Sequence, residues 1–466
     1  MMDKKDAVKM LLKLGEIPTQ EKIDGIINNS KSETITIQKP VELPKKKFSE
    51  YGSDVQVLSS YEYKPKKIEI ADFSALFRER YDFLKGLLIN RPGMENAMSI
   101  SHLRPSSEEV VIVGMINEIN KLPTGTLRLT IEDLTGNVTA IISTKNADLM
   151  KQATYLALDE VLAFKGKFAR NILFVDELVW PDIPSEPRPK SPDQAYAVFS
   201  SDLHIGSKMF LEKNFMKFID WLNGKYGNSK LQEIAKKTKY IFVLGDLVDG
   251  VGIYPGQKKE LTHNDIYKQY DAVANYLSKI PSDKHIIIIP GNHDAGRMVE
   301  PQPPLFKDLA APIYALPNVI SVSNPSLIQV HQHDDFRGLK VLAYHGYSYD
   351  YFVDKIEALR NAGGYDRPDK IIEFLLKRRH LSPTYGSTLV MPSSEDHNLI
   401  RDRPDVIASG HIHKAGIASY RNVLMLSSSC WQSKTPFQER VGHNPDPCKI
   451  PIVDLKEGKA SMLEFG

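Results

Sequence analysis

The sequence predicts an α/β domain of layered sheets flanked by helices, preceded by an all-β barrel and a small N-terminal helical module. Three observations support this. After residue 195, short apolar runs typical of buried strands recur, with helical segments between some of them. Between residues 110 and 178, apolar and polar residues alternate in short runs around turn residues. Near the N-terminus, apolar residues recur instead with helical spacing.

Residues 1–30 are the first predicted element, a helical module whose apolar residues flank a Gly-Glu-Ile-Pro turn. Helices that serve only packing are the alternative interpretation. Residues 31–71 are polar and carry the runs Pro-Lys-Lys-Lys and Lys-Pro-Lys-Lys, which predicts a flexible linker. The lysine runs are candidates for contact with nucleic acid, but a solvated linker is the preferred interpretation.

Residues 72–185 are predicted to form a barrel domain with a leading helix. Phe73, Leu76 and Phe77 begin an amphipathic helix over 72–90. The alternating segment 110–143 and a strand pair over 161–178 follow. Their pattern resembles an OB-fold, a barrel that often binds single-stranded nucleic acid. Basic and aromatic residues are sparse here, so packing against a neighbour and direct DNA binding both stay open. A proline-rich spacer over 181–192 ends the domain.

Composition excludes several classes of protein. The net charge is +2, so any binding to nucleic acid depends on local patches or on a partner. Only two cysteines are present, which argues against a disulfide scaffold and fits a reducing compartment. No apolar run reaches the roughly 18 residues of a membrane helix, and the N-terminus lacks the pattern of a signal peptide. We expect a soluble cytoplasmic protein with no membrane partner.

The domain predicted over 195–466 contains five strand-like runs that end in the same kinds of side chain. Each run stops at a short motif rich in Asp, His, Asn or Gly. The motifs are Asp202-Leu203-His204, Gly245-Asp246-Leu247-Val248-Asp249-Gly250, Gly291-Asn292-His293-Asp294, His345-Gly346 and Gly410-His411-Ile412-His413. In open α/β sheets, the carboxyl ends of parallel strands share one edge, where ligands bind. We therefore expect the five motifs to converge.

The residue types in these motifs fit a site for two divalent metal ions. Carboxylate, imidazole and amide donors suit such ions, and a pair of ions can clamp the attacking and leaving oxygens of a phosphate ester. Five of the thirteen histidines lie in the motifs. Each motif alone has a simpler explanation as a turn, a surface tripeptide or a core histidine. All five in this order favour a site. Histidine-rich ligation favours manganese, iron, nickel or zinc over magnesium.

With these motifs, residues 195 to 430 resemble the calcineurin-like metallophosphoesterase family. The resemblance implies that Asp246 bridges two ions and that the remaining ligands divide between them. For the first ion they are Asp202, His204 and His413; for the second they are Asn292, His345 and His411. It further implies that His293 contacts the scissile phosphate and assists the leaving oxygen, with Asp294 orienting His293. Asp249 would support a ligand from behind.

The order of barrel and phosphoesterase resembles the small subunits of archaeal family D DNA polymerases. The stretches 254–277, 343–356 and 427–438 extend that resemblance beyond the metal motifs. It implies a 3′→5′ exonuclease that proofreads single-stranded or mismatched 3′ ends of primer-template DNA for a larger catalytic subunit, in the nucleoid of an archaeal cell. Intact ligand positions favour an active enzyme, with manganese as the expected ion.

Three alternatives remain: a non-catalytic scaffolding subunit, a DNA-repair nuclease of the same superfamily, and a phosphomonoesterase. Repair nucleases of this superfamily place the phosphoesterase first, whereas about 190 residues precede it here. Tyr254, Lys258 and Lys259 of the loop 250–264 are candidates for DNA contact, against a solvated loop. Arg378 and Arg379 are candidates for phosphate contact, against a solvated helix end.

Overall fold

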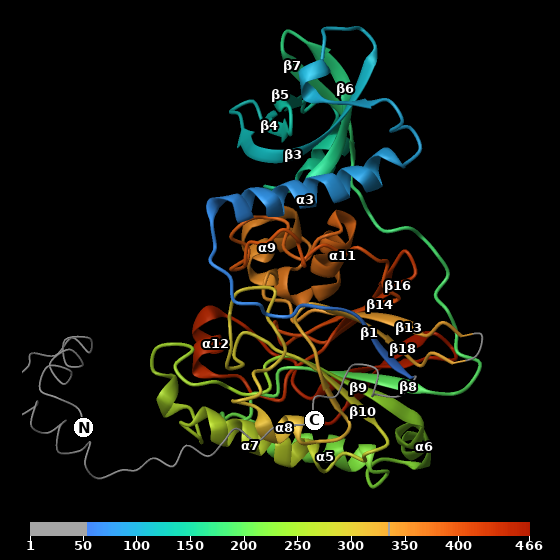
Figure 1. Ribbon diagram of the computed structural model, residues 1–466, viewed down its shortest axis with the longest axis vertical. Coiled ribbons are helices and arrows are strands. Elements are labelled where there is room, and N and C mark those ends of the chain that lie inside the picture. The colour runs from blue at the N-terminus through green and yellow to red at the C-terminus, as the bar shows by residue number, and fades with distance from the viewer. Residues whose placement is uncertain (1–53, 334–335) are drawn as a thin grey trace, which may run out of the picture. The chain divides into compact units, whose positions relative to one another are not determined.

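The computed structural model describes residues 54–333 and 336–466 (Figure 1). The predicted helical module over 1–30 and the part of the predicted linker over 31–53 lie outside the described residues. Within the described residues, an all-β barrel is followed by a sandwich of two sheets with helices on both outer faces. The expected fold class is therefore confirmed for these two parts of the chain.

The barrel is a closed sheet in which β3 pairs with both β4 and β6. Its strands are β2 (Ala97–Met98), β3 (Glu109–Lys121), β4 (Leu127–Asp133), β5 (Gly136–Ile142), β6 (Val161–Ala169) and β7 (Ile172–Val179), with α4 (Ala147–Ala153) and the 3-10 turn η2 (Ile100–His102). Alternating apolar residues such as Leu129, Ile131 and Phe164 fill its interior. The helix α3 (Ile70–Ile89) packs against the outside of β3 and β6 through Leu84 and Leu88.

Two six-stranded sheets form the sandwich. In order, the first contains β11 (Val319–Ser321), β10 (His285–Ile289), β9 (Thr238–Leu244), β8 (Tyr196–Ser200), β17 (Lys449–Asp454) and β18 (Lys459–Glu464). The second contains β1 (Val55–Ser60), β12 (Ser326–Val330), β13 (Leu339–Ala343), β14 (Val406–Ser409), β16 (Val423–Ser427) and β15 (Gly416–Tyr420). Between the sheets, residues such as Phe199, Phe242 and Val341 are fully buried. The long apolar runs read from the sequence follow from this burial on both faces.

Helices cover the outer face of each sheet (Figure 1). On the first sheet lie α5 (Glu212–Leu222), α6 (Ser229–Lys237), α7 (Ile266–Leu277) and α8 (Ala311–Tyr314). On the second lie α9 (Tyr349–Lys355), α10 (Glu357–Asn361) and α11 (Pro368–Arg378). The remaining elements are η3 (Gln257–Lys259), η4 (Gly364–Asp366) and α12 (Pro436–Val441). None of the helices in the described residues is long and apolar enough to cross a membrane. Cys430 and Cys448 are buried and unpaired.

One part of the predicted linker is wrong. Residues 55–60 form the edge strand β1, which pairs antiparallel with β12 from Val55–Val330 to Ser60–Ser326. The pairing is favourable because Val55 enters the core between the sheets, where it is only 4% exposed. The sequence analysis missed this short strand because the lysine runs on either side make the segment as a whole polar. The average composition of a long segment cannot identify a strand of six residues within it.

Strand direction brings the motifs to one end of the sandwich. The strands β8, β9 and β10 run parallel, and so do β13 and β14 in the other sheet. Their carboxyl ends therefore lie at a shared edge within each sheet, as expected from the sequence.

Candidate metal centre

The five motif loops bring their polar side chains into direct contact. His204 and His413 place their Nε2 atoms 3.1 Å apart. His413 Nε2 lies 3.3 Å from Asp202 Oδ1, and His345 Nε2 lies 2.9 Å from Asn292 Oδ1. Residues more than two hundred positions apart in sequence thus meet in one site, which is the convergence that the motifs predicted.

Possible ligand atoms gather in overlapping groups within 4.8 Å of one another. One group is Asp202, His204 and His413, and these are three of the ligands expected for the first ion. Another joins Asp202 and Asp246 to His345, whose Nε2 lies 3.5 Å from Asp246 Oδ2. A third contains His204, Asp246 and His293. Asp246 is shared by the last two groups, a position that suits a bridging carboxylate.

The backbone of these loops is held in an unusual conformation. Five site residues have a left-handed φ, between 50° and 69°: Asp202, His204, Asp246, His411 and His413. This conformation is unfavourable for side chains other than glycine, and it clusters at functional sites. Gly291 and Gly410 permit the close approach. A Cβ atom would lie 2.2 Å from Asp246 Oδ1 at Gly291 and 1.8 Å from Ser201 Oγ at Gly410.

The histidine rings are oriented by contacts on their outer nitrogens. His204 Nδ1 lies 3.1 Å from Asp249 Oδ1, and His345 Nδ1 donates to the Leu244 carbonyl at 2.7 Å. Both contacts leave Nε2 facing the other donors. This arrangement is typical of metal-binding histidines, in which the second ring nitrogen is fixed by a carboxylate or carbonyl. Asp249 thus lies where a residue supporting His204 is expected.

His411 has a comparable contact that the sequence did not reveal. Its Nε2 lies 3.0 Å from Asp350 Oδ2 of α9, which leaves Nδ1 as the available donor. The ring lies beside His345, with centroids 5.2 Å apart. The backbone N–H of His411 also donates to Asp202 Oδ2 at 2.9 Å. Asp350 was missed because it lies in a helix, five residues after His345, and belongs to none of the strand-end motifs.

The predicted contact between Asp294 and His293 is corrected by the structure. His293 Nδ1 donates instead to the Asp249 carbonyl at 2.8 Å. The carboxylate of Asp294 accepts from the backbone N–H groups of Gly291 at 2.9 Å and Leu247 at 3.2 Å. It is buried and therefore ties the second motif loop to the third. Burial, together with the nearby Asp246 carboxylate, raises the pKa of Asp294 to about 7.

Two glutamines that the sequence analysis did not identify hold Asp249. Gln257 Nε2 donates to Asp249 Oδ2 at 3.0 Å, and Gln432 Nε2 donates to Asp249 Oδ1 at 2.9 Å. Gln257 anchors the loop that carries the proposed DNA contacts. Within this loop Lys258 and Lys259 are exposed, and the Tyr254 hydroxyl donates to Glu260 at 2.8 Å. The loop is therefore attached to the centre, with its two lysines facing solvent.

Charges in the centre depend strongly on one another. Burial alone would raise the pKa of Asp246, but His345 and His293 lower it well below its usual value. Burial opposes protonation of His345, yet the same Asp246 raises the pKa of His345 to about 10. Burial lowers the pKa of His204. The carboxylates of Asp202 and Asp246 therefore attract positive charge to the site.

The residues present fit divalent metal ions. Asp202 Oδ1 is buried and accepts no hydrogen bond within the described part of the chain; its ion-pair contacts there are with histidine nitrogens, His413 Nε2 at 3.3 Å being the nearest. An unsatisfied buried carboxylate oxygen is costly, and a cation would satisfy it. Inward-facing Nε2 atoms of His204 and His345 supply borderline donors next to it.

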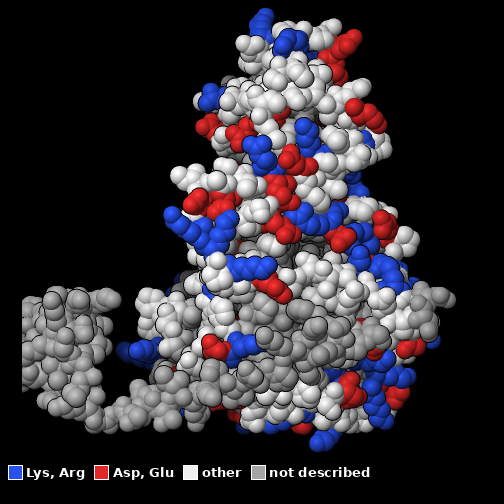
Figure 2. Space-filling view, viewed as in Figure 1, with Lys and Arg blue, Asp and Glu red and all other residues white. Residues whose placement is uncertain are grey.

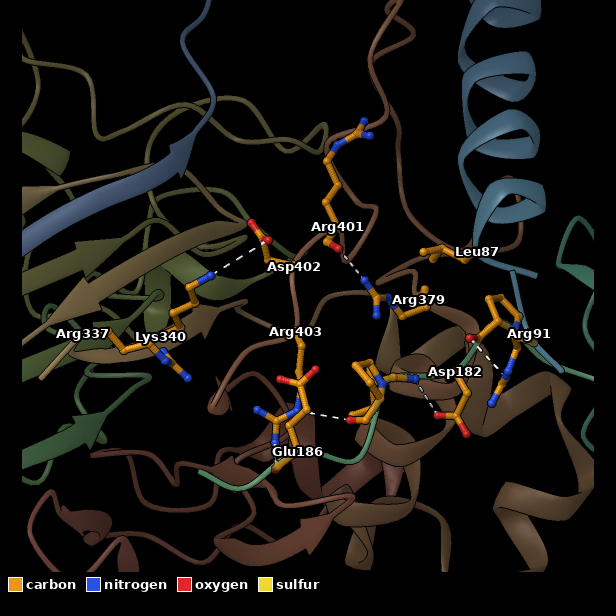
Figure 3. A pocket seen from close by; sticks show the side chains of 13 residues that line it. Leu87, Arg91, Asp182, Glu186, Arg337, Lys340, Arg379, Arg401, Asp402 and Arg403 are labelled. Carbon is orange, nitrogen blue, oxygen red and sulfur yellow. Dashed lines mark hydrogen bonds and ion pairs between the residues drawn. The ribbon is translucent and has the colours of Figure 1, made fainter. Parts of the chain in front are cut away.

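The two arginines considered for phosphate contact lie elsewhere and are buried, so a solvated helix end is wrong for both. Arg378 forms an ion pair with Glu160 of the barrel at 2.7 Å. Arg379 lines a cavity of about 560 Å³ beside the spacer, together with Arg91 and Arg403 (Figure 3). Its guanidinium donates to the backbone carbonyls of residues 400 and 401. Arg378 therefore joins the barrel to the sandwich, whereas Arg379 holds the loop over residues 400–401 beside the cavity.

Sequence comparisons agree with this geometry. The profile of the calcineurin-like phosphoesterase family matches residues 197–415. A protein of Archaeoglobus fulgidus named DNA polymerase II small subunit is 40% identical over 397 residues, which cover 85% of this chain and 77% of that protein. The protein of the same name from Methanothermobacter thermautotrophicus is 36% identical, with 85% and 80% covered. That from Pyrococcus furiosus is 37% identical, but only 64% of its length is covered, against 86% of this chain.

The double sheet and its motif loops thus define a calcineurin-like phosphoesterase domain, preceded by an OB-like barrel. Relatives of the same name match across the barrel as well as the phosphoesterase, at 36% to 40% identity. The chain belongs to the family of DNA polymerase II small subunits. A solved archaeal phosphodiesterase superposes with a TM-score of only 0.29 at 15% identity, over 58% of this chain and 99% of that one, and supports no inference.

Proposed function

We propose that the chain is a 3′→5′ exonuclease that hydrolyses phosphodiesters at single-stranded or mismatched 3′ DNA ends. It would proofread as the small subunit of a heteromeric DNA polymerase whose larger subunit synthesises DNA. The observation that carries the proposal is the convergence of two buried carboxylates with histidines whose Nε2 atoms face them. This donor set suits a two-metal phosphodiesterase.

The proposed ligands divide between two ions. Asp202, His204 and His413 would hold one ion, and Asn292, His345 and His411 the other, with Asp246 between them. When bound, divalent ions supply positive charge for the phosphate oxygens and lower the pKa of water. We propose manganese as the ion; iron, nickel, zinc and magnesium are the alternatives. Asp249 and Asp350 would fix the rings of His204 and His411.

His293 is proposed to act on the substrate. Its ring is held by the Asp249 carbonyl at 2.8 Å, packs edge-on against His204 with centroids 4.7 Å apart, and is partly exposed. Nδ1 is occupied by this contact, so Nε2 is the nitrogen left for the substrate. From there it would contact the scissile phosphate and pass a proton to the departing 3′ oxygen. Asp294 contributes by holding the loop that presents His293.

Charge distribution supports a partner in DNA binding. On the face shown in Figure 2, Lys and Arg side chains are interspersed with Asp and Glu. The whole chain carries a net charge of only +2. DNA binding rests mainly on neutralising phosphates with basic residues. We therefore propose that the larger subunit supplies part of the DNA-binding surface, while Tyr254, Lys258 and Lys259 guide the strand near the centre.

A 5′-labelled single strand tests the activity. With manganese, the wild-type chain should produce products that shorten from the 3′ end. His293→Ala should lower the rate by about 10²- to 10⁴-fold, the usual contribution of acid–base catalysis. The bound metal should be unchanged, because His293 acts on phosphate. The exposed His102 offers a control, since His102→Ala removes a histidine of the barrel domain that belongs to none of these motifs.

Three outcomes would contradict parts of the proposal. Loss of metal in His293→Ala would place His293 among the ligands. If the isolated chain is inactive, the same assay is repeated on its complex with the larger subunit. No cleavage there would reject the exonuclease and favour a scaffolding subunit. Turnover of a small aryl phosphate without cleavage of DNA would favour a phosphomonoesterase.

A further inference from the structure

A second cluster of metal-binding side chains lies outside the centre just described. Asp193, His331 and His333 place one donor atom each within 4.8 Å of one another. The two histidines point the same nitrogen at the same oxygen: Asp193 Oδ1 is 2.8 Å from His331 Nε2 and 3.0 Å from His333 Nε2. Two imidazoles and a carboxylate are a common donor set for zinc.

The topology places this cluster at the opposite end of the sandwich. Asp193 precedes β8, whereas the catalytic motif residues Asp202 and His204 follow it. His331 and His333 follow β12, which runs antiparallel to β13. The end of β12 therefore lies beside the start of β13, away from His345. The cluster is thus separate from the candidate metal centre and belongs to no motif of that centre.

The neighbours of the cluster orient it as a ligand set. His331 is 1% exposed, and its Nδ1 lies 3.0 Å from the Tyr240 hydroxyl of β9. If Nδ1 carries the proton and donates to Tyr240, Nε2 is left with a lone pair for a metal. Ser191 Oγ donates to Asp193 Oδ1 at 2.7 Å and fixes the carboxylate. Among the described residues, Lys239 is the only lysine or arginine that forms an ion pair with Asp193, and its Nζ lies 4.0 Å from the other oxygen, Oδ2.

We propose that Asp193, His331 and His333 bind a single zinc-class divalent ion, with water in the fourth position. Donor atoms around a tetrahedral zinc lie roughly 3.3 Å apart, because each bond is about 2.0–2.1 Å. The separations of 2.8 and 3.0 Å to Asp193 Oδ1 would lengthen by a few tenths of an ångström, and the two histidine donors lie within 4.8 Å of one another. Partial exposure of His333 and Asp193, at 30% and 50%, provides a path for the ion.

Such an ion would directly tie two segments together, the one that enters β8 and the one that leaves β12. Asp193 directly follows the proline-rich spacer over 181–192, and Tyr240, which contacts His331, belongs to the first sheet. His331 follows β12, the strand that pairs with the edge strand β1 of the second sheet. Its backbone N–H donates to the carbonyl of residue 54, just before β1, at 2.7 Å. The ion would thus join both sheets where the spacer and the N-terminal strand arrive. Its role would be to stabilise the fold, without contact with the DNA end.

Metal analysis of the full chain loaded with zinc tests the site. His333→Ala and Asp193→Asn should each bind one zinc ion fewer per chain than the wild type, whereas His102→Ala should bind the same number. Zinc should raise the temperature of thermal unfolding less in the two variants than in the wild type. Cobalt in place of zinc should give a wild-type-minus-variant spectrum of a four-coordinate site. Cleavage of DNA by the manganese-loaded variants should match that of the wild type.

An unchanged zinc content in both variants would overturn the proposal and leave a hydrogen-bonded His-Asp-His cluster. Loss of zinc together with loss of cleavage would also overturn it, because the missing ion would then belong to the centre at the other end. The proposal does not rest on the exonuclease activity, since zinc content is measured independently of cleavage.

Discussion

The metal centre and the junction between barrel and sandwich both bury charged side chains, but they compensate the charges differently. At the junction, each buried carboxylate meets a guanidinium: Glu160 lies 2.7 Å from Arg378, and Asp396 lies 2.8 Å from Arg80. In the metal centre, Asp202 and Asp246 form ion pairs only with histidines among the described residues.

This difference separates a structural from a functional use of buried charge. An arginine is charged at every accessible pH, so the junction is compensated by the chain itself. A histidine is charged only when protonated, and its neutral form is the one that binds a metal. A buried carboxylate surrounded by imidazoles is therefore balanced either by protonated histidines or by metal ions that replace those protons. Removing the partner of a buried carboxylate should therefore lower the stability of the fold at the junction, whereas removing a partner of a proposed ligand should lower metal affinity in the centre.

The largest effect on stability is expected from Arg378→Met. The substitution leaves Glu160 buried without its cation, and breaking a buried pair in this way costs about 3–5 kcal/mol. Urea unfolding should show this loss in the free energy of unfolding. The metal content should stay at the wild-type level, because Arg378 lies in the junction and contacts no proposed ligand.

Lys377→Met is the matched control, since Lys377 precedes Arg378 and pairs with Glu373 at the surface. Exposed pairs of this kind contribute about 0–1 kcal/mol. The double variant Arg378→Met/Glu160→Leu should recover part of the loss, because neither charge is then left alone. A similar stability for Arg378→Met and Lys377→Met would show that the buried pair does not hold the junction.

A smaller effect, on metal affinity, is expected from Asp350→Asn. Asp350 contacts the proposed ligand His411 at 3.0 Å, and loss of such a supporting carboxylate typically lowers metal affinity about 10- to 100-fold. His411→Ala removes the ligand itself and should lower metal occupancy further. Equilibrium dialysis against manganese measures both. Asp354→Asn is the control, since Asp354 lies in the same helix and is 68% exposed. Unchanged metal content in His411→Ala would remove His411 from the ligand set.

Much of the sandwich could be predicted because its strands are buried on both faces. The run of isoleucines over 286–289 has no polar side, so it identifies a strand and the position of its end. The convergence of the motifs could be predicted from these strand ends, because parallel strands of a sheet end at the same edge. The edge strand β1 could not be predicted in this way. It is partly exposed and polar, and it is stable only because β12 is present as its partner.

The contacts that orient the proposed ligands were also beyond prediction. Asp350, Gln257 and Gln432 come from a helix and from loops whose local sequence carries no metal motif. Their positions depend on how those segments pack in three dimensions. For the same reason, the buried ion pairs of Arg378 and Arg80 were hidden, because each joins residues more than two hundred positions apart.

The junction also offers a test by pH, with the smallest expected effect. His380 Nε2 lies 2.9 Å from Asp396 Oδ2, while Nδ1 accepts the backbone N–H of Ser382 at 2.9 Å. The buried ring is therefore neutral, because a proton on Nδ1 would lose this hydrogen bond. Burial, with the nearby Arg80, lowers the pKa of His380 to about 4, against about 6.5 in the unfolded chain.

The unfolded chain consequently binds the proton first as the pH falls. This contribution to stability is fully present above about pH 6.5 and is lost progressively as the pH falls toward 4. His380→Gln keeps a donor and an acceptor but cannot titrate. The free energy of unfolding should therefore decrease more steeply for the wild type than for His380→Gln between about pH 7 and pH 5. Parallel curves would mean that the pKa of His380 is the same in the folded and the unfolded chain, so that the buried ring takes up a proton near pH 6.5 without cost to the fold.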